Sequence, residues 1–176
     1  MVVEQHVQTN ATLINDEWCD CFERNDIVVG VSVDGPEDIH NSHRRFRNGK
    51  GSHGMTMRGI RKLRERNIPI HAISVLTADA LDQPERMYAF FRDEDILHVG
   101  FNVEEQEGVN LSSSMQGEEK EQRYRAFLAK FWSCNQRDGF PVKVREFEQV
   151  MGMIAGGHRL RQNEMNRPYS ILSVDA

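Results

Sequence analysis

The chain has 176 residues, of which 39% are hydrophobic and 28% are charged, and this composition is typical of a globular protein with one core. Its formal net charge of −5 argues against a dedicated nucleic-acid or membrane-surface binder, which normally carries a basic excess. Neither a run of about 18 apolar residues nor a basic-then-apolar leader occurs, so we expect no membrane span, no signal peptide and a cytoplasmic location.

Strand and helix patterns alternate along the first hundred residues. We expect strands at 2–9, 27–33, 68–76 and 97–103. We expect the intervening helices at 15–25 with Asn15 as its cap, at a segment that carries Met57, Ile60 and Leu63 and ends near Asn67, and from Pro84 to about residue 93, where Asp82 and Glu85 fit a capping box. The strand at 27–33 is almost wholly apolar, as strands covered on both faces tend to be. This alternation predicts an α/β fold with right-handed crossovers and a parallel sheet.

The pattern changes after residue 117. Apolar residues at 124, 127, 128, 131 and 132 follow the spacing of a strongly amphipathic helix. A second helix is predicted after Pro141, with apolar residues from Val144 to Ile154 and an end at Gly156 and Gly157. Residues 169–174 return to strand character.

The three cysteines favour reduced thiols. Cys19 and Cys21 lie two positions apart in a predicted helix and so do not share a face, and Cys134 is distant in sequence. An odd, sparse set is unlike a disulfide framework. We therefore predict core or surface thiols with no metal ion bound to them.

Polar residues follow each predicted strand, where ligands bind in parallel α/β architectures. They are Gln8, Thr9, Asn10, Ser32, Asp34, Gly35, Pro36, Thr77, Asn102, Glu104 and Glu105. Because these strand ends share one edge of the sheet, the side chains are expected to converge. Loops are commonly polar, however, and Asp34-Gly35-Pro36 is also a turn signature, so a purely structural explanation stays open.

Other chemistries fit the same region less well. The stretch "NGKGS" lacks the preceding glycine and strand of a phosphate loop. Asp38, His40 and His43 have a spacing that a metal site could use, although a solvated loop explains it too. Ser32, Asp34 and a nearby histidine lack a nucleophile elbow. Nine lysine or arginine residues lie between His40 and Arg66 with few aromatics, which favours a solvated helix face over an RNA groove.

The stretch "QTNATLINDEWCDCFERNDIVVGVSVDGPEDIHNSHRR", residues 8–45, resembles the middle of the radical S-adenosylmethionine (SAM) enzymes that mature peptides and proteins. This group contains the anaerobic sulfatase-maturating enzymes and the cyclophane-forming maturases of glycine-rich ribosomal peptides. The blocks "QTN", "SVDGP", "IH" followed by arginine, and "VLT" occur in the order and spacing of that family. The stretch "GFNVEEQEGVN" is more similar to the cyclophane branch than to the sulfatase branch.

The resemblance implies an architecture and a cofactor. Residues 1–117 would be the C-terminal portion, about four βα units, of a partial (βα)6 radical SAM barrel; 118–167 a helical linker; and 168–176 the start of an auxiliary-cluster (SPASM) domain. The implied cofactor-binding residues are Gln8, Asn10, Ser32, Asp34, Arg44, Val103 and Glu104. Arg44 would hold the methionine carboxylate, which suits a planar guanidinium because it offers two parallel charge-assisted hydrogen bonds. Val103 and Glu104 would lie near the adenosyl part.

Two family features are missing from this sequence. It lacks the CxxxCxxC motif that binds the [4Fe-4S] cluster, and it lacks the "GGE" segment that contacts the SAM amino group. The two absent βα units would occupy on the order of 60 residues. We therefore expect no catalytic or metal-binding residue in this chain and no activity from it alone, although the parent would remove a hydrogen atom from a peptide or protein by way of a 5′-deoxyadenosyl radical.

Alternatives remain at this point. A non-catalytic peptide-binding or degenerate half-barrel would keep the fold without radical chemistry, and sulfatase formylglycine maturation is the alternative within the family. The expected partner is a precursor peptide or protein. The free edge of the first strand is also expected to promote association.

Overall fold

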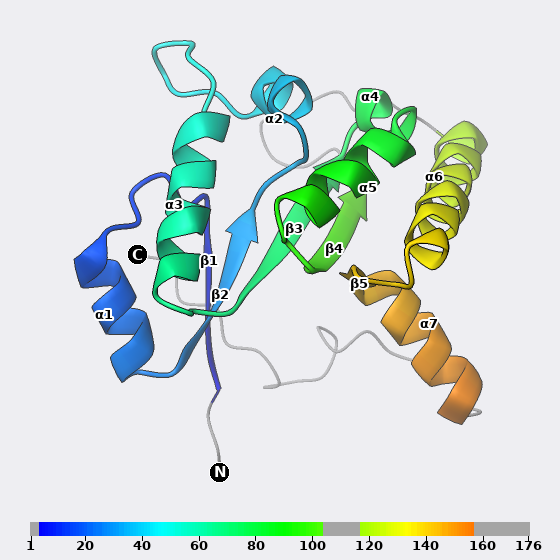
Figure 1. Cartoon of the computed structure of the whole chain (residues 1–176). Helices are drawn as coiled ribbons and strands as arrows, with labels where there is room; N and C mark the ends of the chain where they lie inside the picture. Colours follow the sequence, from blue (N-terminus) through cyan, green and yellow to red (C-terminus); the bar gives the residue numbers. More distant parts are fainter. Residues whose placement is uncertain (1–3, 104–116, 157–176) are drawn as a thin grey trace. The chain divides into compact units, whose positions relative to one another are not determined.

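The computed structural model describes residues 4–103 and 117–156, and its centre is a five-stranded parallel sheet in the order β1-β2-β3-β4-β5 (Figure 1). The strands are β1 (Gln5–Thr9), β2 (Ile27–Ser32), β3 (Ile70–Leu76), β4 (His98–Val103) and β5 (Lys143–Val144). Every neighbouring pair is parallel. The predicted α/β fold with a parallel sheet is therefore confirmed, and the two-residue strand β5 is an addition to it.

Seven helices occur in the described residues. They are α1 (Asp16–Arg24), α2 (Glu37–His43), α3 (His53–Glu65), α4 (Ala78–Leu81), α5 (Pro84–Asp93), α6 (Gly117–Arg137) and α7 (Arg145–Gly156). Helices α1, α3, α5 and α6 lie on one face of the sheet (Figure 1). The predicted helices match α1, α3, α5, α6 and α7. The short helices α2 and α4 were not predicted, and the predicted strand at 169–174 lies outside the described residues.

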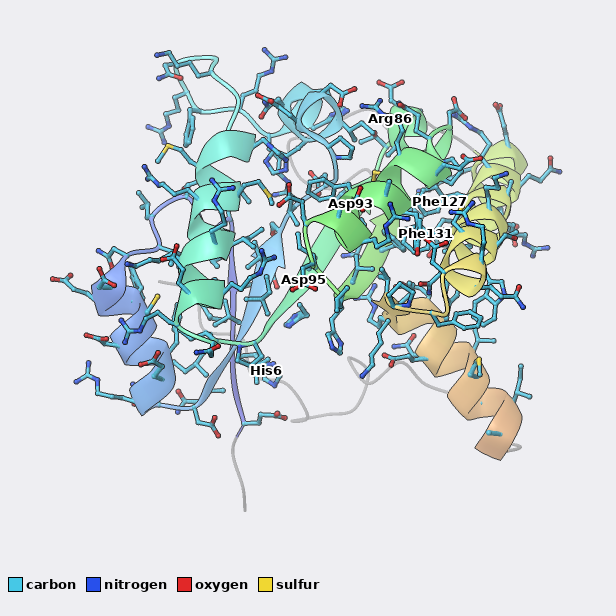
Figure 2. The ribbon with its side chains drawn as sticks, viewed as in Figure 1. His6, Arg86, Asp93, Asp95, Phe127 and Phe131 are labelled. Carbon is cyan, nitrogen blue, oxygen red and sulfur yellow. The ribbon has the colours of Figure 1, made fainter. Side chains whose placement is uncertain are left out.

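The core fills the space between this helical layer and the sheet. Val29, Val31, Ala72, Leu76 and Val99 are buried on the covered face. Four aromatic rings, those of Phe91, Phe101, Phe127 and Phe131, stack edge to face or at a tilt, with centroids 5.2–6.0 Å apart. Figure 2 shows Phe127 and Phe131 on the side of α6 that faces α5 and the sheet. This cluster explains the apolar spacing in α6, because the helix must bury that stripe.

The opposite face of the sheet carries no helix from the described residues of the first unit, 4–103 and 117–145 (Figure 1). In β3, Ala72, Ser74 and Leu76 are buried, whereas His71, Ile73 and Val75 alternate with them and are half-buried. In β2, Ser32 is likewise half-buried. The apolar composition of β2 predicted cover on both faces, and the described residues provide it on one.

Capping was predicted correctly for one helix and wrongly for another. The Oδ1 atom of Asn15 accepts a hydrogen bond from the main-chain N–H of Trp18 at 3.0 Å, as a helix cap does. The capping box at α5 is absent, because Gln83 occupies the cap position without a side-chain bond. Asp82 and Glu85 instead pair with Arg123 and Lys130 of α6, at 3.0 and 2.9 Å. The two acidic side chains thus pair with basic residues of a distant helix instead of capping α5.

The chain divides into two compact units, residues 1–145 and 146–176. The first unit holds the whole sheet and helices α1 to α6. The described part of the second unit is the remainder of α7, up to Gly156. None of the helices in 4–103 and 117–156 is long and apolar enough to cross a membrane.

Candidate functional site

Two side chains predicted as ligands meet where β1 and β2 end. The Nε2 atom of Gln8 donates a hydrogen bond to the Oγ atom of Ser32 at 3.2 Å. Gly30 lies opposite Gln8 in the ladder, and a Cβ atom there would collide with the Gln8 side chain and come within 2.7 Å of Nε2 of His71. Glycine at position 30 therefore leaves the room that lets Gln8 extend across the strand toward Ser32. The Gln8 amide and the Ser32 hydroxyl thus place polar groups together at the carboxyl ends of β1 and β2.

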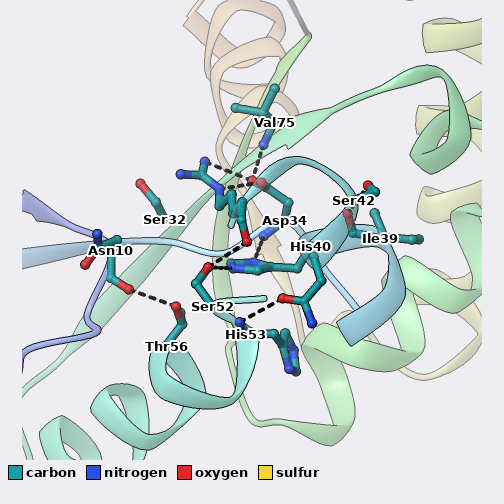
Figure 3. Close-up of polar contacts among 12 residues, drawn as sticks. Asn10, Ser32, Asp34, Ile39, His40, Ser42, Ser52, His53, Thr56 and Val75 are labelled. Carbon is teal, nitrogen blue, oxygen red and sulfur yellow. Dashed lines mark hydrogen bonds and ion pairs between the residues drawn. The ribbon is translucent and has the colours of Figure 1, made fainter. Parts of the chain in front are cut away.

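Asp34 and Arg44 form a second pair, a bidentate ion pair. Nη2 of Arg44 donates to Oδ1 of Asp34 at 3.1 Å, and Nε of Arg44 donates to Oδ2. The same Oδ1 accepts the main-chain N–H of Val75 at 2.9 Å, which ties the carboxylate to β3 (Figure 3). Asp34 is buried while the Arg44 side chain keeps about 30% of its surface exposed. Asp34 therefore orients Arg44 at the end of the sheet.

This pairing gives Asp34 and Arg44 a contact with each other that was not predicted. The prediction treated Asp34 and Arg44 as separate ligands, whereas in the structure they bind each other through the Nε/Nη2 edge of the guanidinium. A guanidinium has five N–H donors, so the Nη1/Nη2 edge of Arg44 stays available, with no partner among the described residues. That edge has the geometry that binds a carboxylate with two bonds.

A buried histidine lies behind this pair. His40, fully enclosed on α2, accepts the main-chain N–H of Asp34 at its Nδ1 atom, over 3.2 Å. Its Nε2 atom lies 3.0 Å from Oγ of Ser52, and that hydroxyl donates to the carbonyl oxygen of Arg44 at 3.0 Å. Because Nδ1 accepts, the neutral ring carries its proton on Nε2 and donates it to Ser52. Burial lowers the pKa of His40 to about 4, which keeps the ring neutral near neutral pH.

The other residues predicted to bind the cofactor are Asn10, Val103 and Glu104. Asn10 uses its Oδ1 atom to accept from the N–H and hydroxyl of Thr12, at 3.1 and 2.9 Å, and its carbonyl accepts from Oγ1 of Thr56 at 2.9 Å. Asn10 thus shapes the turn after β1. Val103 is the half-buried last residue of β4. Glu104 lies outside the described residues.

The metal alternative is not supported in the described residues. His40 is in the core, and Asp38 is bonded to Arg86 at 2.8 and 3.0 Å, which lowers the pKa of that carboxyl. No group of three potential metal ligands occurs in 4–103 and 117–156. Cys19 and Cys134 are separately buried free thiols, and Cys21 is a half-buried one, as predicted. These residues do not fit an iron–sulfur cluster, which needs several thiolates at one point.

Sequence reasoning missed the contribution of Ser52 and misjudged that of His40. The only local signal was the pair of residues "IH" between "DGP" and the arginine, which the resemblance had already marked as a block. A hollow of about 190 Å³ lies beside α2 and α4 and contains none of the residues predicted to bind SAM. It is lined by Asp38, Ile39, Ser42, Asp79, Asp82 and Gln83.

Comparisons with known proteins identify the family to which this fold belongs. The family model of the radical SAM superfamily matches residues 2–103. An uncharacterised protein of Synechocystis is 45% identical over 168 residues, which are 96% of this chain and 42% of that protein. The serine-type anaerobic sulfatase-maturating enzyme of Bacteroides thetaiotaomicron is 34% identical over 66% of this chain and 30% of its own length. The chain thus spans less than half the length of these curated relatives.

Solved structures show the same fold. The structure of anSMEcpe with bound AdoMet superposes with a TM-score of 0.78 and 23% identity, covering 91% of this chain and 43% of that one. A further structure of native anSMEcpe, with AdoMet and the Kp18Cys peptide, has the same TM-score and covers 45% of that chain. The parallel sheet and its helices therefore match part of a radical SAM barrel. By the match to its family model, this chain belongs to the radical SAM superfamily.

Proposed function

We propose that this chain provides the part of a radical SAM enzyme that binds the methionine end of SAM, and that the intact enzyme modifies a peptide or protein. One observation carries the proposal: Arg44 is oriented by Asp34 so that its second edge stays open, at the end of the sheet where Gln8 and Ser32 meet. The AdoMet in the solved neighbour supports the cofactor, and the peptide in the other supports the substrate class.

The chemistry of the residues fits the methionine end of SAM. This end carries one carboxylate and one ammonium group, and Arg44 would bind the carboxylate through two parallel hydrogen bonds. Since Asp34 already balances the charge of Arg44, recognition would depend on hydrogen-bond geometry more than on net charge. Gln8 and Ser32 would supply further polar contacts. Val103 and Glu104 remain proposed neighbours of the adenosyl part.

When bound next to a reducing cluster, SAM supplies radical chemistry that removes a hydrogen atom from a substrate. The described residues of this chain hold and orient SAM in our proposal, and they do not fit the cluster. A cluster-bearing segment would therefore have to complete the site. The outer edge of β1, which has no strand partner among the described residues, is the proposed place of association.

For the substrate, the relatives support a chemical class and not a particular molecule. A peptide or protein substrate is supported by the sulfatase-maturating relatives and by the peptide of the solved neighbour. We extend it to a ribosomal precursor peptide, with cyclophane formation as the proposed product because of the similarity of residues 100–110 noted above. Formylglycine formation in a sulfatase is the competing product.

Calorimetric titration of the full chain tests the SAM site. The ligands are SAM and decarboxylated SAM, which lacks the carboxylate, and the variant is Arg44→Lys, which keeps a positive charge near Asp34. Lysine cannot form the two parallel bonds, so we expect the affinity for SAM to fall by about tenfold or more. The affinity for decarboxylated SAM should change little.

The matched control is Arg45→Lys. Arg45 is the exposed neighbour, and its Nε donates only to the carbonyl of Asn41 at 2.8 Å, so this variant should leave both affinities unchanged. An equal loss for both ligands in Arg44→Lys would place the carboxylate elsewhere. No SAM binding by the unaltered chain, combined with tight binding of a precursor peptide, would favour a non-catalytic binding module.

A further inference from the structure

The contacts around α2 lead to an inference about how Arg44 is held, and it rests on the proposed function. We propose that His40 and Ser52 form a positioning relay for SAM recognition: together they fix the main chain of both members of the Asp34–Arg44 pair. Neither His40 nor Ser52 would touch SAM. Their effect would reach the ligand through the orientation of the Arg44 guanidinium.

The relay is a directed chain of hydrogen bonds. The N–H of Asp34 donates to Nδ1 of His40 at 3.2 Å, Nε2 of His40 donates to Oγ of Ser52 at 3.0 Å, and that hydroxyl donates to the carbonyl of Arg44 at 3.0 Å. Each side chain in the series accepts one hydrogen bond and donates the next. Hydrogen bonds in such a series polarise and strengthen one another. His40 is fully buried and Ser52 is 8% exposed, so water competes little for these bonds. The His40 ring and the Ser52 hydroxyl together therefore connect the main chains of both ion-pair partners.

Arg44 needs this support because of its place in the chain. It ends helix α2 with an extended conformation, φ −104° and ψ 97°, so its carbonyl has left the helical ladder. The segment between Arg44 and Ser52 is an exposed turn, closed by a single antiparallel bridge between Arg45 and Gly51. Ser52 closes the same turn with its own N–H, which donates to the Arg44 carbonyl at 3.2 Å. The hydroxyl adds a second, partly buried bond to this carbonyl.

The side chain of Arg44 is fixed separately, by Asp34. Oδ1 of Asp34 also accepts from Val75, so the carboxylate has a set position on β3. If only the side chain of Arg44 were held, movement of its main chain could still change the orientation of the guanidinium. Because the relay fixes the main chain and Asp34 fixes the side chain, the open Nη1/Nη2 edge would have one orientation. Preorganisation of this kind raises affinity by lowering the ordering cost of binding.

The test compares hydroxyl variants at one buried position. Ser52→Ala removes the relay, whereas Ser52→Thr keeps the hydroxyl and should restore binding. Ser42→Ala is the matched control, because the Ser42 hydroxyl also donates to a main-chain carbonyl, that of Ile39, at 2.6 Å, but lies outside the relay. The readout is calorimetric affinity for SAM and for decarboxylated SAM. Circular dichroism verifies that each variant is folded.

We expect Ser52→Ala to weaken SAM binding by about tenfold and to change the affinity for decarboxylated SAM by less than about twofold. His40→Asn keeps an acceptor for the Asp34 N–H but has no donor that reaches Ser52. Because the two residues act in series, the double variant should lose no more SAM affinity than Ser52→Ala alone. Equal losses for both ligands, or additive losses in the double variant, would overturn the inference.

A second measurement separates this inference from the proposed function. Hydrogen exchange of the Arg44 Nε–H, followed by NMR without any ligand, should be faster in Ser52→Ala than in the unaltered chain or Ser42→Ala. If that exchange accelerates while the chain binds no SAM, the relay stands and the proposed function fails. If SAM binds and neither exchange nor affinity responds to Ser52→Ala, the relay is refuted and the proposed function survives.

Discussion

The buried imidazole of His40 makes the stability of this protein sensitive to mild acid. Burial lowers the pKa of His40 from 6.5 to about 4, because the charged ring would be desolvated. In the unfolded chain the ring regains the higher value. Between these two pH values the unfolded state binds a proton that the folded state does not, so the free energy of unfolding falls as the pH falls from 6.5 to 4.

The magnitude follows from the gap between the two pKa values. This difference in pKa corresponds to about 3 kcal/mol in the free energy of unfolding. The contribution is fully present above the pKa of the unfolded state and is lost once the pH falls to the pKa of the folded state. A loss of this size is a large part of the marginal stability of a single domain. Burial also lowers the pKa values of His53 and His71, so these rings add losses of the same sign as the pH falls.

The assay is urea unfolding at a series of pH values between about 7 and about 4.5, for the unaltered chain and for His40→Gln. The variant should be less stable at neutral pH, because the Asp34 N–H loses its acceptor, but it should lose less stability on acidification. The two curves should therefore converge toward low pH. The loss from His71 cancels in the comparison, whereas the loss from His53 cancels only in part, because its ring packs on that of His40 with centroids 5.4 Å apart. Parallel curves would refute the argument that His40 is kept neutral by burial.

Two substitutions test the packing that positions the site. Gly59→Ala should destabilise by about 1–3 kcal/mol, because a Cβ atom there meets the main chain of Ala11, while Gly54→Ala in the same helix meets nothing within 4 Å and should be neutral or stabilising. Phe101→Ala should cost about 3–5 kcal/mol by opening the aromatic cluster, against less than about 1 kcal/mol for the exposed Phe140→Ala, both measured by chemical unfolding. These contacts would be contradicted if Gly59→Ala had the same free energy of unfolding as Gly54→Ala. They would also be contradicted if Phe101→Ala and Phe140→Ala lowered it equally.

The alternation of strands and helices could be predicted because it depends on local periodicity. Residues 27–33 and the apolar stripe of α6 carry their structure in their own spacing. The capping box at Asp82 and Glu85 failed because their partners, Arg123 and Lys130, are some forty residues away. Local patterns contain no information about which charge arrives from a distant helix.

The positions of the candidate residues at the strand ends could be predicted, but the hydrogen bonds between their side chains could not. Gln8 and Ser32 meet because parallel strands bring their ends to one edge, which the sequence order implies. The Asp34–Arg44 pair was not foreseen, because it forms only when residues 37–43 become helix α2. That short helix was expected to be a loop, since its buried side is only Ile39 and His40.

We propose that SAM binds at the ends of β1 and β2 with its carboxylate on Arg44. An amide NMR titration of the full chain with SAM tests the location directly. We expect the largest shifts at the main-chain amides from Gly30 to Asp34, at the Gln8 side chain and at the Arg44 Nε–H. Saturable shifts confined to the α5 and α6 surface, or no shifts at any SAM concentration, would contradict it.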